Sequence, residues 1–376
     1  MEKKLSIGIV GLGQFGKGFV PIFKAHPIVG RVAVCDIDKK KLETVAKEYK
    51  IQETYPDLDA ICKSDLDALA IITQHWLHAP QAIQAMEAGK HVYSAVPVIT
   101  PRSGRSSEIY DWCEKIIATC KKTGLKYMLG ETSYFRPEVQ YAMAKHAKHE
   151  FGHISLVEAE YLHDTLLPAS NLIKVMMART GLSEQEVYKL GGGVPMHYVT
   201  HSASVPVAIT GAHATEVSCF GYAMPGDNYF RQDSEASNVF CNEIATFMMS
   251  DGSIGRVIEG RRVGHVGREA LVRVLGTKAS MEVTLKGAIW SDMKRFELVD
   301  VECRPKLPKP LGKFSGHGGS HPYLVDEFVR SIVEGHQPKT NAWEAARYAA
   351  IGAAAHDSAL QGGKLVKVPD WGDAPK

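Results

Sequence analysis

Two histidines and a tyrosine lie close together in the segment GGGVPMHYVTH, at positions 191–201. In a helix, His197 and His201 would share one face, and Tyr198 would lie one turn from His201. An imidazole titrates near neutral pH and suits general acid–base chemistry. A zinc site would need a third ligand, and a zincin-type helix would carry Glu where this chain has Tyr198, so we expect no metal. The alternative is a pair of structural histidines.

Other polar side chains stand at the ends of expected strands or in a glycine-rich loop, where ligands meet open α/β folds. They are Tyr134 and Arg136 in GETSYFRPEV (130–139), His163 and Asp164 in YLHD (161–164), and His317 and Tyr323 in GHGGSHPY (316–323). Packing tyrosines, surface arginines and plain turns are the alternatives. We expect Arg261 and Arg262 to lie on a solvated sheet face, with neutralisation of an anionic substituent as the alternative.

A nucleotide loop opens the chain. The apolar run LSIGIV (5–10) predicts a buried strand, and GLGQFG (11–16) leads into a helical segment. Gly11, Gly13 and Gly16 form GxGxxG, which permits a tight turn, close approach of a pyrophosphate and close helix packing, with Gln14 and Phe15 completing the loop. A second strand (31–36) ends in Asp36, which would bind a ribose diol and favour NAD over NADP. Lys39 and Lys40 leave NADP as the weaker alternative.

The alternation of elements predicts the fold class. Strands at 66–73, 91–96 and 126–132 alternate with helices at 39–49, 78–90 and 106–124, which indicates a doubly wound parallel sheet, an α/β Rossmann domain over residues 1–132. Segments with strand-like alternation follow at 152–164, 214–224, 237–250, 254–264, 270–284 and 287–293. Helices at 320–335 and 341–360 and a closing strand complete an α+β domain over 133–376. We expect its open, largely antiparallel sheet to leave one face for a partner subunit, and its last helices to pack partly on the first domain.

Bulk properties exclude some functions. A chain of 376 residues suggests two domains, and a net charge of +2 argues against nucleic-acid binding. No apolar run is long enough for a membrane span, and we expect no cleavable signal before the first strand. The seven cysteines are scattered without a CxxC, so we expect buried inert thiols in a reducing compartment, and a cytoplasmic location.

The block DLDALAIITQHWLHAPQAIQAMEAGKHVYSAVP (65–97), together with the glycine loop and Asp36, resembles the Gfo/Idh/MocA oxidoreductase superfamily. The resemblance implies that Thr73, His75, His78, Ala95 and Pro97 border the cofactor. It departs where the family carries Glu and the catalytic Lys, which are Ala95 and Val96 here. Lys90 is no substitute, because the family also has a lysine there. In the family's second domain, a pattern with Asp and His four residues apart maps onto His197 and His201, facing nicotinamide and substrate.

A branch of this superfamily, the NAD-dependent α-N-acetylgalactosaminidase-like glycosidases, also lacks that lysine. Its motifs resemble SYFRPE, LHD, YVTH and HGG in this chain, in the same order. The resemblance implies tightly bound NAD that takes a hydride from C3 of a sugar and returns it after elimination and addition of water. Tyr198 and His201 would deprotonate the substrate, with Tyr134 and His163 in support. His197, Arg136, Asp164, His317 and Tyr323 would contact a sugar or glycoside, in a homodimer or homotetramer formed through the open sheet.

Three alternatives stay open at this point. A sugar or cyclitol dehydrogenase would release NADH. A 3-keto-glycoside lyase or epimerase would share the oxidation step. A non-enzymatic NAD sensor is compatible with the lost lysine, but the polar residues at 197–201 disfavour it.

Overall fold

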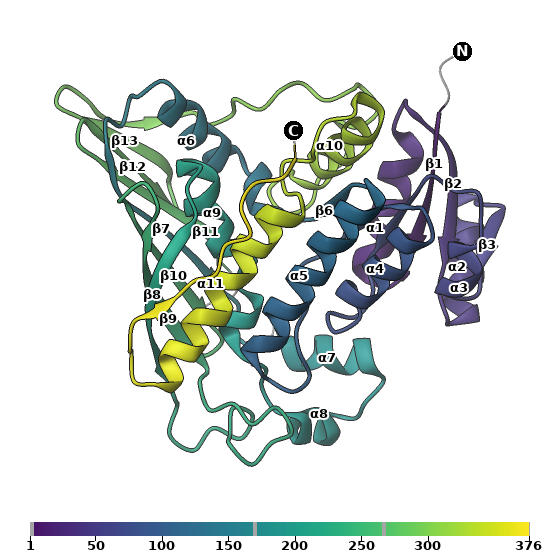
Figure 1. The fold of residues 1–376 in the computed structure, drawn as a ribbon, viewed down its shortest axis with the longest axis horizontal. Helices are drawn as coiled ribbons and strands as arrows, with labels where there is room; N and C mark the ends of the chain where they lie inside the picture. Colours follow the sequence, from purple (N-terminus) through teal and green to yellow (C-terminus); the bar gives the residue numbers. More distant parts are fainter. Residues whose placement is uncertain (1–3, 168–170, 265–267, 376) are drawn as a thin grey trace.

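The computed structural model describes residues 4–167, 171–264 and 268–375. Two sheets lie side by side in it, joined by helices (Figure 1). The first sheet has the strand order β3-β2-β1-β4-β5-β6, and every pair in it is parallel. Its strands are β1 (Leu5–Val10), β2 (Val29–Cys35), β3 (Glu53–Tyr55), β4 (Ala68–Ile71), β5 (His91–Ser94) and β6 (Tyr127–Leu129). Because the strands are parallel, their carboxyl ends share one edge, where nucleotides bind in this architecture.

The helices of this half follow the predicted alternation, apart from the short α3. They are α1 (Gln14–Ala25), α2 (Lys39–Tyr49), α3 (Leu58–Cys62), α4 (His78–Glu87) and α5 (Ser106–Thr123). In α1, Phe19, Val20 and Phe23 recur at helical spacing and are fully buried, which explains why the segment forms a helix against the sheet. The sequence did not indicate β3 or α3, because both are too short to show periodicity.

The second sheet has nine strands in the order β14-β13-β12-β11-β7-β10-β9-β8-β15. It is mostly antiparallel, with one parallel pair between β7 and β10. Its strands are β7 (Ile154–Leu162), β8 (Ala214–Tyr222), β9 (Asn242–Met249), β10 (Ile254–Gly260), β11 (Arg268–Gly276), β12 (Ala279–Thr284), β13 (Gly287–Asp292), β14 (Phe296–Val299) and β15 (Val366–Lys367). The single segment expected at 270–284 is wrong, because the chain turns at 277–278 and pairs β11 with β12.

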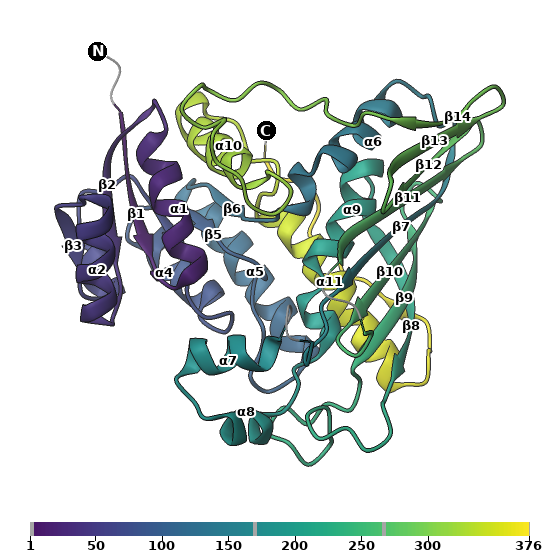
Figure 2. The same cartoon turned by 180° about the vertical axis from the view of Figure 1, so that it is seen from behind.

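Helices cover only one face of the second sheet (Figures 1 and 2). The remaining helices are η1 (Ser133–Phe135), α6 (Pro137–Ala147), α7 (Leu172–Thr180), α8 (Glu184–Leu190), η2 (Pro195–Tyr198), α9 (Thr200–Thr210), α10 (His321–Glu334) and α11 (Ala342–Leu360). Helix α11 is almost entirely buried, and it contacts both α5 and β8. Its many alanines allow this close approach on several sides. Helix α10 returns to the first half, where Phe328 packs against Phe23 of α1.

Six cysteines are buried, but Cys303 is exposed, so the expectation of seven buried thiols is wrong at that position. Cys303 lies between β14 and α10, in a stretch without regular structure. Within the described ranges, no helix combines the length and apolar character needed to cross a bilayer.

Candidate active site

The glycine loop has the shape that a dinucleotide phosphate requires. Gly11 has a φ of +91°, and a Cβ on Gly16 would lie 1.9 Å from the Gly11 carbonyl oxygen. A Cβ on Gly13 would meet nothing within 4 Å. Gly13 is also the N-cap of α1, where no side chain caps the helix. Open space beside uncapped N–H groups fits a bound phosphate. The loop therefore has the space and the donors that the NAD implied by its sequence would need.

Asp36 follows β2 and holds the loop in place. One carboxylate oxygen accepts the N–H of Leu12 at 2.7 Å, and the other accepts the N–H of Asp38 at 2.8 Å. Lys39 and Lys40 are exposed at the start of α2. The carboxylate therefore lies beside the glycine loop, where a ribose diol would be bound, and its selection of NAD over NADP stays a prediction.

Two of the predicted residues after β4, Thr73 and His78, make contacts within the protein. His78 is buried, with Nδ1 2.8 Å from the carbonyl oxygen of Pro97 and Nε2 3.2 Å from that of Thr73. Burial lowers the pKa of His78 to about 4, so the ring is neutral and donates to only one of these two carbonyl oxygens. The Thr73 hydroxyl donates to Gln81 Oε1 at 2.5 Å. These contacts join the ends of β4 and β5, and a contact of either side chain with the cofactor stays a prediction.

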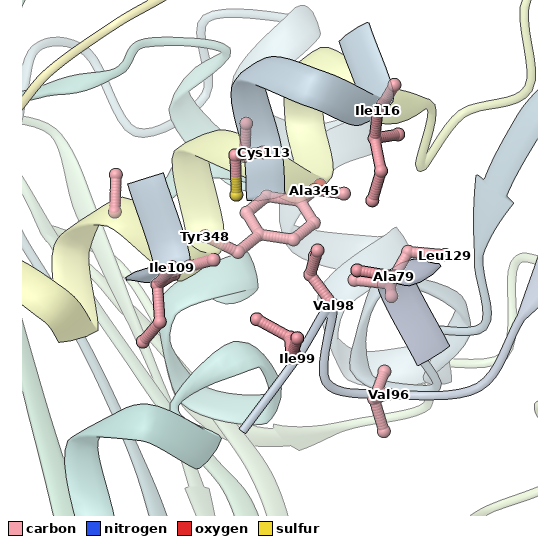
Figure 3. Close-up of a cluster of buried hydrophobic side chains, with 14 of the residues drawn as sticks. Ala79, Val96, Val98, Ile99, Ile109, Cys113, Ile116, Leu129, Ala345 and Tyr348 are labelled. Atoms are coloured by element: carbon pink, nitrogen blue, oxygen red, sulfur yellow. The ribbon is translucent and has the colours of Figure 1, made fainter. Parts of the chain in front are cut away.

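Apolar packing replaces the family's lysine. Val96 is 7% exposed and belongs to a hydrophobic cluster with Ala79, Val98 and Ile99 (Figure 3). The adjacent Ala95 is buried as well. Lys90 is also buried, and its ammonium group donates to the carbonyl oxygen of Ser64, at the opposite end of β5. Neither position presents an amine to a substrate.

The centre of the site is His201, at the start of α9. Its Nδ1 lies 2.8 Å from Oε1 of Glu131, which follows β6, and both side chains are buried. Burial alone would raise the pKa of Glu131, but the charge and hydrogen bond of His201 and the N–H of Ser133 outweigh it and lower that pKa. A carboxylate only accepts, so Nδ1 carries a proton, and Nε2 is the nitrogen that can release or take up the second one.

Aromatic rings surround this imidazole. Ring centroids of Tyr161 and Tyr198 lie 5.0 and 5.7 Å from that of His201, and the His317 ring is stacked at 6.4 Å. The Tyr161 hydroxyl is hydrogen-bonded to Nδ1 of His163 at 2.7 Å. Side chains from the LHD, YVTH and HGG segments therefore meet around His201.

The HGG loop also contacts the glycine loop. The Phe15 ring meets those of His317 and His321 edge to face, at 5.7 and 5.3 Å. His317 Nδ1 and His321 Nε2 are 2.8 Å apart. The acid–base cluster and the nucleotide loop thus form one continuous site. The described part of the chain contains no group of three or more side chains arranged to hold a metal ion.

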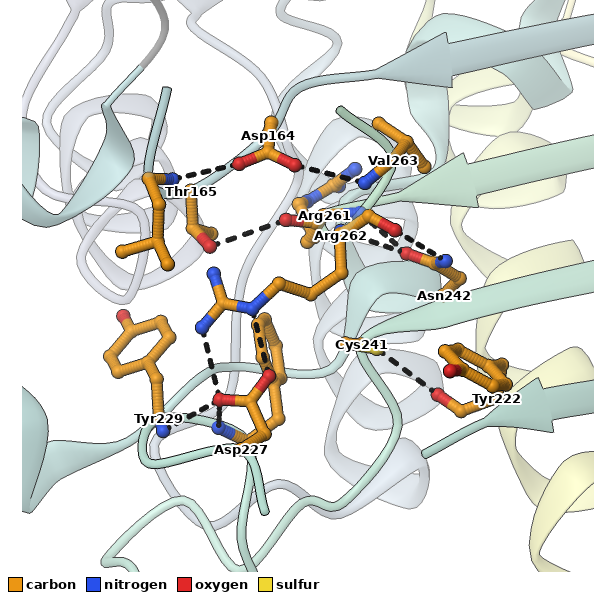
Figure 4. Close-up of polar contacts among 12 residues, drawn as sticks. Asp164, Thr165, Tyr222, Asp227, Tyr229, Cys241, Asn242, Arg261, Arg262 and Val263 are labelled. Carbon is orange, nitrogen blue, oxygen red and sulfur yellow. Dashed lines mark hydrogen bonds and ion pairs between the residues drawn. The ribbon is translucent and has the colours of Figure 1, made fainter. Parts of the chain in front are cut away.

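A buried ion pair lies behind His201. Glu259 accepts from the Ser202 hydroxyl at 2.5 Å and from Arg261 at 2.9 Å, and burial raises its pKa to about 7. The Arg261 guanidinium also lies 5.1 Å from the Tyr161 ring centroid. Arg262 pairs with Asp227 at 2.8 Å (Figure 4). The expected solvated arginine pair is therefore wrong: both side chains turn inward to buried carboxylates.

Four predicted site residues have other surroundings. His197 does not share a helix with His201, because η2 ends at Tyr198 and α9 begins at Thr200. Its ring lies beside Ser106 and His356, so the expected common helix face is wrong. The Tyr134 ring packs on Phe135. Burial, together with the negative charges of Glu327 and Glu344, raises the pKa of its hydroxyl. The last two contact neighbouring structure. Asp164 accepts the backbone N–H of Leu166 and that of Val263, the latter drawn in Figure 4, and the Arg304 guanidinium lies over the Tyr323 ring.

Arg136 lies against the HGG loop. Its Nη1 is 3.7 Å from Glu138 Oε1, and a Cβ on Gly318 would lie 3.8 Å from the same nitrogen. It thus borders the loop that carries His317, and its contact with substrate stays a prediction.

Sequence reasoning missed Glu131, Tyr161 and Glu259. Glu131 is a charged residue at the end of the strand predicted at 126–132, and it follows the shorter observed β6 by two positions, which is the signal that could have found it. Tyr161 precedes His163 by two positions in the strand expected at 152–164, so strand alternation would have placed both on the same side. No local pattern marks Glu259, because its importance depends on the long-range pairing of β10 with β7.

Residues 5–131 match the Gfo/Idh/MocA family, described as an oxidoreductase family with an NAD-binding Rossmann fold. These residues form a domain of that family. The chain is thus an enzyme of the NAD-binding oxidoreductase type.

The uncharacterized oxidoreductase YrbE of Bacillus subtilis (strain 168) is 24% identical over 74% of this chain and 74% of its own length. A glycosyl hydrolase family 109 protein of Streptomyces filamentosus is 23% identical over 97% of this chain and 77% of its own length. Several other curated relatives are matched over half of their length or less. The structure of a levoglucosan dehydrogenase in complex with NADH and levoglucosan superposes with a TM-score of 0.77 at 19% identity, covering 98% of this chain and all of that one. That likeness shows a shared fold over both sheets.

Proposed function

We propose that the chain acts on a sugar or glycoside by transient hydride transfer, as an NAD-dependent glycoside hydrolase. The observation that carries this proposal is that the family's lysine position is apolar in this chain, while groups able to transfer protons gather elsewhere beside the nucleotide loop. Val96 is packed in an apolar cluster where the family has its lysine, whereas His201, Glu131 and Tyr161 form a hydrogen-bonded and aromatic cluster beside the nucleotide loop. The relative named as a family 109 glycosyl hydrolase, which aligns along 97% of the chain, supports the same proposal.

Bound NAD would supply a hydride acceptor and, once reduced, a hydride donor. In the proposed reaction, the hydride leaves C3 of the sugar and returns to it after the aglycone departs and water adds, so the net change is hydrolysis. His201 accepts a proton at Nε2, because Glu131 fixes the proton on Nδ1 and stabilises the imidazolium that forms. The paired Tyr161 hydroxyl and His163 ring hold and move a second proton. Tyr198, whose ring also lies next to His201, is the third acid–base group.

A dehydrogenase that releases NADH is the second candidate. The observation that favours it is the superposition of both sheets on the levoglucosan dehydrogenase. Either reaction uses the same base and the same hydride transfer, and they differ in whether the cofactor stays bound. A 3-keto-glycoside lyase or epimerase would share the first oxidation and would lack the addition of water.

The test uses protein purified without added cofactor. Denaturation should release about one equivalent of NAD(H) per chain. Native protein should then cleave members of a panel of aryl glycosides without a lasting rise in absorbance of reduced nicotinamide, and His201→Asn should abolish cleavage while keeping the nucleotide. A steady rise that needs added NAD, with the glycosidic bond intact, would replace this proposal with the dehydrogenase.

We also infer that the uncovered face of the second sheet binds a second copy of the chain, giving a homodimer or homotetramer. Phe220 on β8 is 65% exposed, and it pairs across the sheet with Ile244, which is 42% exposed. Ile244 in turn pairs with Ile258 of β10, so an apolar row crosses three strands. Such a row costs free energy in water unless another surface covers it. Ile244→Arg should shift the protein to monomer in light scattering. A cytoplasmic location, which the free cysteines favour, stays a proposal.

A further inference from the structure

We propose that Arg179 on α7 is a positioning residue that clamps the loop after β4 and slows release of the nucleotide. This inference rests on the proposed function, which needs a cofactor that stays bound from one turnover to the next. The clamp assigns a purpose to α7 and α8, which sequence analysis did not identify and which contribute no side chain to the His201 cluster among the contacts described above.

Two hydrogen bonds join α7 to the loop at residues 74–75. The side-chain amide of Gln74 donates to the carbonyl oxygen of Arg179 at 2.8 Å, and Arg179 Nη1 lies 2.8 Å from Nε2 of His75. The partners are more than 100 positions apart in the chain. Gln74 and His75 lie just beyond β4, a central strand of the first sheet, on the edge where its parallel strands end. The contact therefore links the second half of the chain to the border of the cofactor cleft.

The chemistry of the pair fixes the state of His75. A guanidinium only donates, so Nε2 of His75 must be the unprotonated nitrogen. His75 is half-buried and Arg179 is exposed. Partial loss of solvation, followed by the charge of Arg179, lowers the pKa of His75 below its usual value. The His75 ring also lies 5.2 Å from that of Tyr198. Arg179 thus holds a neutral ring that packs directly on an aromatic side chain of the acid–base cluster.

The helix that carries Arg179 is anchored to the second sheet. Ile173 of α7 and Val187 of α8 share a small core with Tyr229 and Phe230, from the connection between β8 and β9. The buried pair of Arg262 and Asp227 fixes the same connection next to β10. Helix ends are defined as well, by Asn171 before α7 and by a capping box at Ser183 before α8. In both ribbon views, α7 lies below α4 and α5 in the first half (Figures 1 and 2).

This arrangement makes a clamp rather than a catalytic group. The Gln74 bond uses a backbone carbonyl of α7, so only the Arg179 side chain can be removed without disturbing it. Opening of the loop at 73–77 would require both bonds to break. A nucleotide bound along the carboxyl edge of β4 is released more slowly when that loop is held.

The experiment measures nucleotide dissociation. Protein loaded with NADH is mixed with excess NAD, and loss of the fluorescence of bound NADH gives the rate. Arg179→Ala should release NADH about tenfold faster, the change in rate expected from loss of one net hydrogen bond. Lys174→Ala, at an exposed position on the same helix, is the matched control and should release it at the wild-type rate. Equal rates for wild type and R179A, or equal acceleration by K174A, would overturn the clamp.

A double-mutant cycle separates the clamp from general loosening of α7. In a His75→Ala background, Arg179→Ala should cause no further acceleration, because its partner is already gone. Full additivity of the two changes would contradict the contact as the cause. The outcomes also differ from those of the proposed function. Wild-type protein that keeps NADH yet cleaves no glycoside sinks the hydrolase reaction alone, whereas retention that is equal in R179A sinks the clamp alone.

Discussion

Among the described residues, two buried histidine–carboxylate pairs have nearly identical geometry. His201 Nδ1 lies 2.8 Å from Glu131, and His356 Nδ1 lies 2.8 Å from Glu243. In both pairs the carboxylate is fully buried and the imidazole almost so. Distance, burial and residue type therefore do not distinguish a catalytic pair from a structural one.

Their surroundings do distinguish them. Glu131 follows a strand of the parallel sheet, and His201 is ringed by Tyr161, Tyr198 and His317. The second carboxylate oxygen of Glu243 instead accepts the N–H of Met196, and the His356 ring packs on His197 within the core. One pair lies next to the nucleotide loop, and the other fastens α11 and η2 to β9. The position of a pair relative to the carboxyl edge of the sheet, rather than its geometry, indicates chemistry.

The largest effect should follow from His201→Asn. Loss of the general base should lower kcat roughly 100- to 10,000-fold, while the folded protein keeps its NAD content near wild type. Turnover measured on the most active glycoside, with nucleotide content as the control, tests this expectation. Retention of more than a tenth of the activity would remove His201 from the mechanism.

The opposite result is expected for the second pair. Glu243→Ala leaves His356 and the Met196 N–H without their buried acceptor, which should cost about 3–5 kcal/mol of unfolding free energy. The protein that stays folded should keep wild-type kcat, because this pair is remote from the nucleotide loop. Urea unfolding and turnover at low temperature check the two halves of the prediction. A loss of kcat without loss of stability would reverse the roles of the two pairs.

The sequence predicted those features that local pattern determines. The two strands that flank the glycine loop and the helix that follows it were predicted correctly because strand, turn and helix occur within a few dozen residues, whereas the contacts of Asp36 with the cofactor stay a prediction. Helices α2 and α5 were predicted almost to the residue because their apolar periodicity is uninterrupted. The hairpin of β11 and β12 was missed because neither loop residue, Thr277 or Lys278, is a glycine or proline, and Gly276 was taken as part of a continuous strand.

The acid–base cluster was only half predictable. His201 and His163 were found through resemblance, but Glu131 reaches His201 across 70 positions of sequence and Glu259 reaches Ser202 across 57. Such pairings depend on how the two sheets meet, which no window of sequence contains. His197 shows the converse error, since helical spacing suggested a shared face that the break between η2 and α9 removes.

Glu259, which lies close to the His201 and Glu131 pair, should make the free energy of unfolding depend on pH. Burial raises the pKa of its carboxyl from 4.5 to about 7. Its contribution to stability is therefore fully present below about pH 4.5 and is lost as the pH rises through about 7, by up to about 3 kcal/mol. Glu259→Gln keeps an acceptor for Ser202 and does not titrate. The difference in unfolding free energy between the two proteins should change over this interval, and a constant difference from pH 4.5 to 8 would show that Glu259 is already ionised when folded.

The smallest effect should come from Tyr134, and it sharpens the same distinction among tyrosines. Tyr134 was predicted to support catalysis, yet its ring packs on Phe135. Burial, followed by the negative charge of Glu327, raises the pKa of its hydroxyl. Tyr134→Phe should therefore leave kcat within about twofold and stability within about 0.5 kcal/mol of wild type. Tyr161→Phe removes the hydroxyl bonded to His163 and should lower kcat at least tenfold. If the two variants lost activity equally, the hydroxyl of Tyr134 would have to reach the substrate in a conformation other than this one. The contrast between a packed tyrosine and a hydrogen-bonded one beside His201 would then fail, as would the argument that surroundings identify the catalytic groups.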